Sequence, residues 1–227
     1  MRGLCFSDKE PDYLEEGMWI TQIKDYDKKR REVILDDGAL HFLLYAGELR
    51  AKHLKAETEL SEEAYRSIVE EILKPRARKR VLYYLKDSDK TRAQVLTKLR
   101  QGMYPQEVID DALQFLEAHR FVDDRRYAEN YIEELKGKKS RREIAAKLYA
   151  RGISGAQARE IMEEALGAED EYEACRKALS GKLGRKASIG EEGELPPDEK
   201  RRAYAFLARK GFSGDAIEYS FRHLKED

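Results

Sequence analysis

The residues of this chain best suited to a chemical task are lysines and arginines, which occur in three groups. Such side chains bind phosphates or the carboxylates of an acidic protein surface. The first group is Arg76, Arg78, Lys79, Arg80, Arg92, Lys98 and Arg100, the second is Lys138, Lys139, Arg141, Arg142, Lys147 and Arg151, and the third includes Arg201 and Arg202. A single basic helix is usually a solvated face. Three groups at corresponding positions of a repeated unit predict a basic stripe that contacts a partner or DNA.

Other reactive side chains form no catalytic or metal-binding pattern. The histidines fall in four different segments, at His41, His53, His119 and His223. Asp123 and Asp124 are adjacent carboxylates, but we expect Asp124 to open a helix, where a carboxylate caps free amides. Neither cysteine has a neighbour at metal-ligand spacing. We therefore expect no enzyme activity, no cofactor and no metal.

The elements that position the basic groups repeat along the chain. Gly102, Gly152 and Gly211 each precede an apolar residue and a new helix start, and they are 50 and 59 residues apart. Apolar side chains recur at the sixth, tenth and thirteenth positions after each glycine, namely Val108, Ala112 and Phe115, then Ala158, Met162 and Ala165, then Ile217, Phe221 and Leu224. This spacing marks one helix face. The shared register predicts one repeated three-helix unit, with each glycine at a left-handed helix end.

The repeats predict a mainly α chain, an elongated tandem array of three three-helix repeats that follows a small α+β N-terminal hairpin domain. We place the repeats at 74–122, 123–167 and 168–227, with a glycine- and proline-rich loop at 180–197 in the third. The expected helices are 75–86, 91–101 and 105–119, then 124–136, 140–150 and 154–166, then 169–182, 197–210 and 213–225. Capping boxes are predicted at Thr91 with Gln94, Ser140 with Glu143, and Ser154 with Gln157.

The N-terminal domain, 18–73, differs from the helical repeats because it is expected to contain strands. Strands are expected at Trp19–Tyr26, Glu32–Leu35 and Ala39–Leu44, with helices near 44–52 and 61–73. Asp37-Gly38 is a residue pair favoured in two-residue hairpin turns. Residues 1–17 are expected to form a loose, flexible extension, and Met18 is a second candidate start.

Charge alternates along the array although the net charge is only −1. Residues 74–102 hold ten Lys or Arg against two Asp, and residues 136–159 hold eight against one acidic residue. The stretches 103–135 and 160–199 carry an acidic excess, so basic and acidic stretches alternate along the array. A helix-turn-helix protein would present its third helix to DNA, and carboxylates there are repelled by phosphates. Sequence-specific reading of the major groove is disfavoured, while sequence-independent phosphate contact stays open.

Composition sets further limits. No apolar run approaches the roughly 20 residues of a membrane span. The first 18 residues are acidic and have no apolar core of a signal peptide. Cys5 and Cys175 lie far apart, which favours free thiols in a reducing cytoplasm.

The segment Phe121-Val122-Asp123-Asp124-Arg125-Arg126-Tyr127-Ala128 resembles the signature of the RecX family of recombination regulators. In that family an apolar pair, Asp-Asp, an aromatic residue and Ala join the first helical unit to the second. Residues 77–85 and 91–99 resemble the family's opening helix pair, 140–153 its middle unit, 202–212 its last unit, and 18–73 the N-terminal extension of longer members. The loop at 180–197 departs from the family pattern.

The resemblance implies a bacterial cytoplasmic protein that binds the RecA nucleoprotein filament and inhibits its ATPase, strand-exchange and coprotease activities. Such a protein modulates recombination, DNA repair and the SOS response. Phe121, Asp123, Asp124, Tyr127 and Ala128 are assigned a structural role at the joint between repeats. We expect a monomer whose basic stripe meets filament DNA or an acidic RecA surface, and whose acidic third helices face a basic RecA surface.

Two alternatives stay open at this point: a sequence-independent DNA-binding protein without a recombinase partner, and a helical scaffold for another protein. Changing Arg141 and Arg142 to Glu is expected to weaken inhibition of RecA without unfolding the chain.

Overall fold

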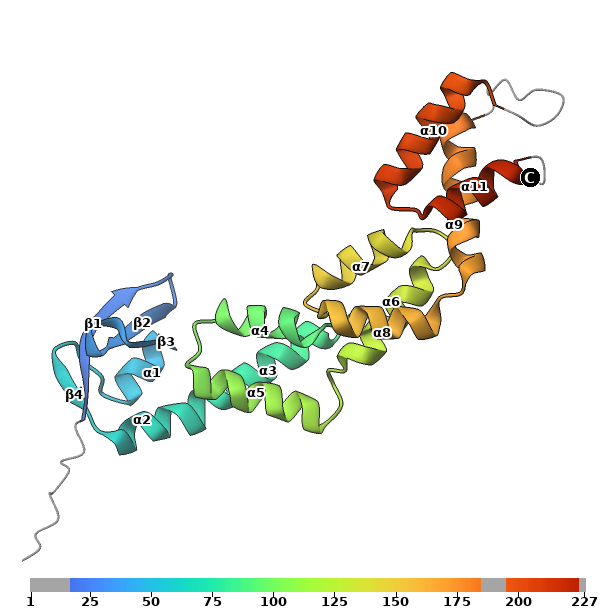
Figure 1. Cartoon of the computed structure of the whole chain (residues 1–227). Coiled ribbons are helices and arrows are strands. Elements are labelled where there is room, and N and C mark those ends of the chain that lie inside the picture. The colour runs from blue at the N-terminus through green and yellow to red at the C-terminus, as the bar shows by residue number, and fades with distance from the viewer. Residues whose placement is uncertain (1–16, 185–194, 225–227) are drawn as a thin grey trace, which may run out of the picture. The chain divides into compact units, whose positions relative to one another are not determined.

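The computed structural model describes residues 17–184 and 195–224, and these are mainly helical, as predicted (Figure 1). They form two compact units. Of the described residues, the first unit contains 17–84 and Thr97–Phe115, and the second contains Leu85–Leu96 and those from Leu116 onward. Residues 1–16 of the predicted extension and residues 185–194 of the predicted loop lie outside the described residues.

The first unit contains a four-stranded antiparallel sheet in the order β3-β2-β1-β4. Its strands are β1 (Met18–Asp25), β2 (Arg30–Leu35), β3 (Leu40–Tyr45) and β4 (Thr58–Leu60), and the short helix α1 (Ala46–Ala51) follows β3. Ile20, Val33 and Phe42 are buried, and the ring of Phe42 packs against Tyr65. The three expected strands are confirmed, whereas β4 was not predicted.

The turn between β2 and β3 differs from the expected two-residue hairpin. Leu35 pairs with Leu40, and a 3₁₀ turn at Asp36–Gly38 connects them. Asp36, Asp37 and Gly38 all have positive φ, at 46°, 53° and 99°. Asp tolerates the left-handed region better than most residues, so three consecutive left-handed residues replace the predicted pair.

The sheet is joined to the first repeat by one continuous helix where two were expected. It consists of α2 (Glu62–Ile68), a π-helical turn at Val69–Leu73 and α3 (Lys74–Leu85). The Lys74 amide bonds the carbonyl of Val69, five residues back. Pro75 cannot donate a backbone hydrogen bond, and the wide turn before it accommodates its ring without ending the helix.

The remaining helices confirm the repeat prediction, with ends within a few residues of those expected. They are α4 (Arg92–Arg100), α5 (Gln106–Ala118), α6 (Asp124–Leu135), α7 (Arg141–Tyr149), α8 (Gly155–Ala165), α9 (Ala168–Leu183), α10 (Pro197–Lys210) and α11 (Gly214–Arg222). Helix α9 continues through Leu183, so the loop does not begin at Ser180 as predicted. None of the described helices has the length and apolar character needed to cross a membrane.

The predicted apolar register forms the cores. Val108, Ala158 and Ile217 are buried in their respective repeats. The second repeat surrounds Ile132, Ile144 and Leu148, and the third surrounds Leu179, Leu207 and Ile217. Cys175 is a buried free thiol in the third core, and its burial raises the pKa of the thiol.

Two of the three marker glycines adopt the expected left-handed conformation, Gly152 with φ 87° and Gly211 with φ 86°. Gly102 does not; the left-handed residue is the following Met103, with φ 52°. The amides of Gly102 and Met103 donate to the carbonyls of Leu99 and Arg100, three residues back, so the C-terminal end of α4 is tightened. The left-handed residue therefore falls one position later than predicted. Gly102 is needed for space, because a methyl group there would lie 2.5 Å from the ring of Tyr104.

Candidate functional site

Several predicted contact residues of the first unit have structural roles. Arg76 donates to the carbonyl of Leu43 at 3.0 Å, pairs with Glu48 and lies over the ring of Tyr45. It therefore fastens α3 to β3 and α1. Arg78 binds Asp111 of α5 through two hydrogen bonds, of 2.8 and 2.7 Å. Both guanidinium groups are neutralised inside the unit.

Lys79 and Arg100 of the same unit are exposed and have no partner among the described residues. Lys98 lies over the ring of Tyr84, 5.3 Å from its centroid. Arg80 is partly buried, and its Nε has no hydrogen-bond partner in the described structure. Lys79 and Arg100 are thus the cations of this unit's basic group that stay available to a ligand.

The second unit uses three more predicted contact residues internally. Arg92 pairs with Glu117 at 2.8 Å. Arg141 donates to the carbonyls of Leu166 and Gly167, at 2.5 and 3.2 Å, and so caps the C-terminal end of α8. Arg151 donates to the hydroxyl of Tyr127 and the carbonyl of Lys147, both at 3.0 Å, and lies over the ring of Tyr131.

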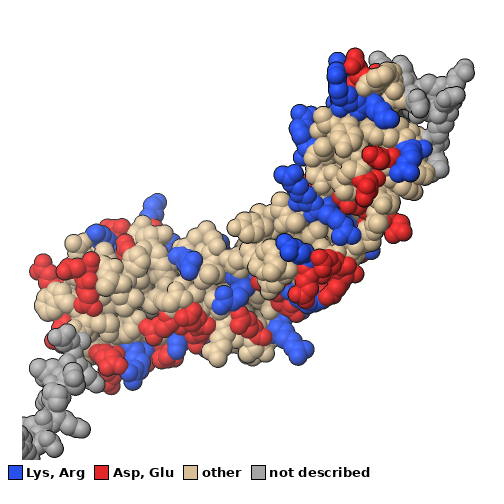
Figure 2. Space-filling view, in the orientation of Figure 1, with Lys and Arg blue, Asp and Glu red and all other residues tan. Residues whose placement is uncertain are grey.

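The surface cations of α7, of the connection before it and of α10 differ in whether they are already paired. Lys139 lies 3.0 Å and Lys147 3.9 Å from Glu143, Arg201 pairs with Asp198, and Lys138 donates to the carbonyl of Glu134. Arg142 and Arg202 are exposed and pair with no described carboxylate. On the face that Figure 2 shows, basic and acidic side chains are interspersed within each unit.

Carboxylates of the third helices are also engaged. Asp111 of α5 binds Arg78, and Glu107 accepts from the Tyr65 hydroxyl at 2.5 Å. Glu160 and Glu164 of α8 both bind Arg125 of α6. The alternation of basic and acidic stretches therefore serves, in part, to pair helices within their own repeat.

The Asp123-Asp124 pair caps two different helices. Asp123 is the N-cap of α6 and accepts from the amide of Arg126 at 3.0 Å, a role that we had assigned to Asp124. Asp124 instead accepts from the amide of Arg92, 2.7 Å away at the start of α4. Its carboxylate thus ties the second repeat to the first, which supports its assignment to the joint.

Other signature residues surround this joint. Ala128 is fully buried in the core of the second repeat, and Tyr127 holds Arg151. Phe121 remains 44% exposed and stacks on His119, so it does not fill a core position.

A second contact recurs between consecutive repeats. The Thr91 hydroxyl accepts from the Gln94 amide and donates to the carbonyl of Arg151 at 2.6 Å. A methyl group at Gly152, the next residue, would lie 2.1 Å from the Cβ of Ala93. The end of α7 therefore lies directly against the start of α4.

The same arrangement joins the second and third repeats. The Ser140 hydroxyl accepts from the Glu143 amide and donates to the carbonyl of Lys210 at 2.6 Å. A methyl group at Gly211 would lie 2.8 Å from the Cβ of Arg142. Thr91 and Ser154 complete their capping boxes, but Glu143 turns to Lys139 and Lys147, so the predicted box at Ser140 is only half formed.

Sequence reasoning missed one surface feature. Each repeat exposes a tyrosine: Tyr83 on α3 is 77% exposed, Tyr149 on α7 73%, and Tyr204 on α10 45%. Each falls outside the buried positions of its helix, such as Ile144 and Leu148 in α7. In the sequence, these tyrosines could have been recognised as exposed because they lie outside the positions at which apolar residues recur.

The repeats and their two equivalent joints define a helical-repeat protein, a class that acts through extended binding surfaces. Among the described residues no group of His, Cys, Asp and Glu is arranged to hold a metal ion. The family models for the first, second and third three-helix domains of RecX match residues 77–116, 123–166 and 169–219. The chain therefore belongs to the RecX family.

Curated relatives span nearly the whole chain. The regulatory protein RecX of Clostridium acetobutylicum is 28% identical over 87% of this chain and 92% of its own length. That of Clostridium tetani is 29% identical over 88% of this chain and 91% of its own. A crystal structure of regulatory protein RecX has the same fold, with a TM-score of 0.58 and 23% identity, and covers 92% of this chain and 100% of that one. RecX from Lactobacillus salivarius gives a TM-score of 0.56 at 21% identity, over 68% of this chain and 98% of that one.

Proposed function

We propose that this chain binds the filament that the RecA recombinase forms on single-stranded DNA and inhibits its ATPase, strand-exchange and coprotease activities. Membership of the RecX family supports this role, since curated relatives are named regulatory proteins. The role is a binding role in the bacterial cytoplasm and involves no catalytic step by this chain.

The observation that carries the proposal is a small set of unneutralised surface side chains. A cation that is already paired gains little from a phosphate or a carboxylate of a partner, because its field is cancelled. Lys79, Arg100, Arg142 and Arg202 are exposed and unpaired within the described residues. These four cations replace the fifteen that the sequence predicts as contact residues.

Helix α7 combines such a cation with an aromatic side chain. Arg142 and Tyr149 are two helical turns apart and fall on the same side of α7, away from the buried Ile144 and Leu148. Arg and Tyr dominate the energetic centres of protein interfaces. We assign this pair to the contact with the filament, where Arg142 meets a phosphate or carboxylate and Tyr149 supplies apolar area.

The carboxylates with internal partners, Asp111, Glu160 and Glu164, are poor candidates for contact with a basic RecA surface. The proposal therefore places the contact on first and second helices of the repeats and assigns these carboxylates to repeat stability.

The test is the ATPase activity of RecA on single-stranded DNA. Adding this chain should lower the rate, and the absence of inhibition at several-fold excess over RecA would overturn the proposal. The variant R142E/Y149A should lose inhibition while its circular dichroism stays unchanged. K24E/K28E is the control: it reverses two charges instead of one, at lysines of the sheet domain that are exposed and unpaired among the described residues, and it should keep inhibition.

A salt titration separates the main alternative. Labelled single-stranded DNA without RecA is the probe, and phosphate contact predicts an affinity that falls steeply with salt. Strong salt-dependent binding together with unchanged RecA activity identifies a sequence-independent DNA-binding protein instead. If the chain neither binds DNA nor inhibits RecA, the alternative that it is a helical scaffold for another protein is favoured.

A further inference from the structure

The edge of the N-terminal sheet is only partly covered. Strand β4 pairs with β1 at Met18, Trp19 and Ile20 and goes no further. On its other side β1 pairs with β2 as far as Asp25. The edge of β1 from Thr21 to Asp25 therefore has no neighbouring strand among the described residues. Such an edge presents unpaired N–H and C=O groups that a further strand can bind.

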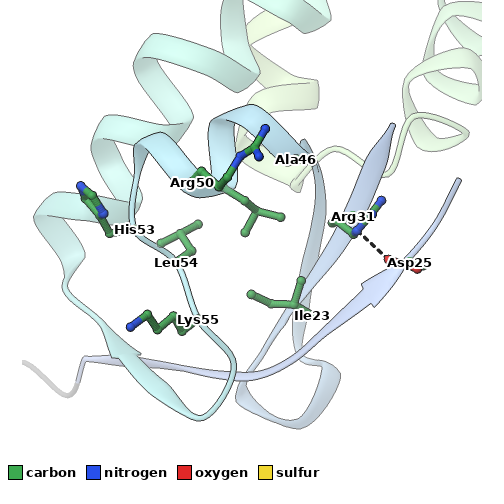
Figure 3. A pocket seen from close by; sticks show the side chains of 9 residues that line it. Ile23, Asp25, Arg31, Ala46, Arg50, His53, Leu54 and Lys55 are labelled. Carbon is green, nitrogen blue, oxygen red and sulfur yellow. Dashed lines mark ion pairs between the residues drawn. The ribbon is translucent and has the colours of Figure 1, made fainter. Parts of the chain in front are cut away.

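A pocket of 480 Å³ opens beside this edge, between β1, α1 and the chain that leads from α1 to β4 (Figure 3). Its apolar lining consists of Ile23, Leu49, Leu54 and Ala46. Ile23 and Leu54 project into the space from opposite sides. The core of the sheet domain thus stays open where β4 is absent, and an apolar side chain can fill the gap.

The polar lining of the pocket is mostly cationic. Arg31, Arg50, His53 and Lys55 contribute basic groups, and Asp25 is the one carboxylate in this lining. Arg31 is paired with Asp25 at 2.6 Å. Arg50 and Lys55 are exposed and have no acidic partner among the described residues. Figure 3 shows Arg50 and Lys55 at opposite ends of this lining, with Leu54 and Ile23 between them. An occupant with a negative charge on each side of an apolar group therefore complements the pocket.

We propose that this pocket and the β1 edge bind an extended acidic peptide segment of a partner protein, which adds a strand beyond Ile20 in line with β4. Alternate side chains of a strand point to the same face. An apolar side chain then enters the space between Ile23 and Leu54, and carboxylates two residues before and after it meet Arg50 and Lys55. The peptide backbone pairs with the free edge of β1.

Other ligands fit the pocket less well. A free phosphate leaves the apolar lining unfilled. Single-stranded nucleic acid binds on aromatic platforms, and the only ring in this lining is that of His53. The inference is independent of the RecA proposal, because it concerns the sheet domain alone and no repeat residue contributes to the pocket.

The probe is a fluorescein-labelled peptide with the core Glu-Thr-Leu-Thr-Glu, which places Glu, Leu and Glu on one face of a strand. Binding to the full chain is followed by fluorescence anisotropy. The Lys-Thr-Leu-Thr-Lys peptide and a peptide with the order Glu-Leu-Thr-Thr-Glu are the controls for charge and for alternation. Both should bind at least about tenfold more weakly, since one reverses the charge and the other moves Leu off the pocket face.

Backbone pairing has its own signature. In an antiparallel pair, alternate residues direct their N–H groups toward the neighbouring strand. N-methylation at Leu and N-methylation at an adjacent Thr should therefore have unequal effects, with one abolishing binding and the other tolerated. Binding that depends on charge alone is insensitive to both.

Protein variants localise the site. R50E/K55E should weaken binding of the Glu peptide by about tenfold or more and strengthen binding of the Lys peptide. K79E/R100E changes the net charge equally within the same unit and should leave binding unchanged. Three results would each overturn the proposal: no binding up to about 1 mM peptide, equal binding of all peptides, or equal effects of the two double variants.

Discussion

The Ser140 hydroxyl donates a 2.6 Å hydrogen bond to the carbonyl of Lys210, although the two residues are 70 positions apart. Thr91 makes the same bond to Arg151 in the preceding joint. Both hydroxyls also cap their own helices by accepting a backbone amide. One oxygen thus acts as acceptor and donor at once, and the joint requires a side chain that can do both.

Substitutions at Ser140 should separate its two roles. Ser140→Thr should keep the stability of the chain, because Thr already occupies the equivalent position 91. Ser140→Ala should lose about 2 kcal/mol, the sum of a cap and a buried hydrogen bond. Ser140→Asp keeps an efficient cap but cannot donate, and its carboxylate faces the Lys210 carbonyl at a fully buried position. Urea unfolding followed by far-UV circular dichroism measures each change.

The ranking is informative because capping alone predicts a different order. Asp is as good an N-cap as Ser. If Ser140→Asp were as stable as the unmodified chain, the bond to Lys210 would contribute nothing to the joint.

Gly152 should tolerate no side chain. Its φ of 87° disfavours L residues, and a methyl group would lie 2.1 Å from the Cβ of Ala93. Gly152→Ala should therefore destabilise the second unit by about 3 kcal/mol or more, from backbone strain and the clash together. The double variant A93G/G152A should be more stable than G152A alone, because removing one methyl relieves the clash. Additive losses in the double variant would show that the close approach is not the cause.

Much of the helical array could be predicted because its signals are local. The apolar positions that place Val108, Ala158 and Ile217 in their cores follow directly from helical spacing. The continuous helix through Pro75 could not be predicted, because only the π turn at Val69–Leu73 makes the proline compatible with it. The short β4 lacks a pattern of its own and is defined by its pairing with β1.

The binding surface was less predictable, since charge in sequence does not show which charges are already paired. Arg141 and Arg142 are adjacent and equivalent in composition, yet Arg141 caps α8 and Arg142 faces solvent. Their difference depends on Leu166, 25 residues from Arg141. The close approach of Gly211 to Arg142 is likewise a tertiary contact that helical periodicity does not reveal.

This difference between neighbours predicts different outcomes for the same substitution. Arg141→Glu should destabilise the second unit by about 2 kcal/mol or more, because it removes two bonds to carbonyls and places a carboxylate beside them. Arg142→Glu should change stability by less than about 0.5 kcal/mol. Thermal unfolding by circular dichroism compares the two. The double variant R141E/R142E, which the sequence suggested as a test of RecA inhibition, therefore changes folding as well as binding. If the two single variants were equally stable, R141E/R142E would again be a valid test of binding.

Alkaline pH should weaken the first unit through Tyr65. Burial of the phenol, and then its 2.5 Å bond to Glu107, raises the pKa of Tyr65 above its ordinary value of 10.0. The neutral phenol is favoured in the fold, so its contribution is complete below pH 10.0 and is lost as the pH rises further. Tyr65→Phe cannot ionise. The free energies of unfolding of the unmodified chain and of Tyr65→Phe should therefore differ by a constant amount around neutral pH. Above about pH 10, the unmodified chain should lose stability relative to the variant. Trp19 is the single tryptophan and lies in the same unit, so its fluorescence during urea unfolding reports the change.

Glu107→Gln is the control: it removes the charge beside Tyr65 but not the burial of the phenol, so most of the pH effect should remain. A difference that stays constant with pH would mean that Tyr65 ionises equally in the folded and unfolded chain.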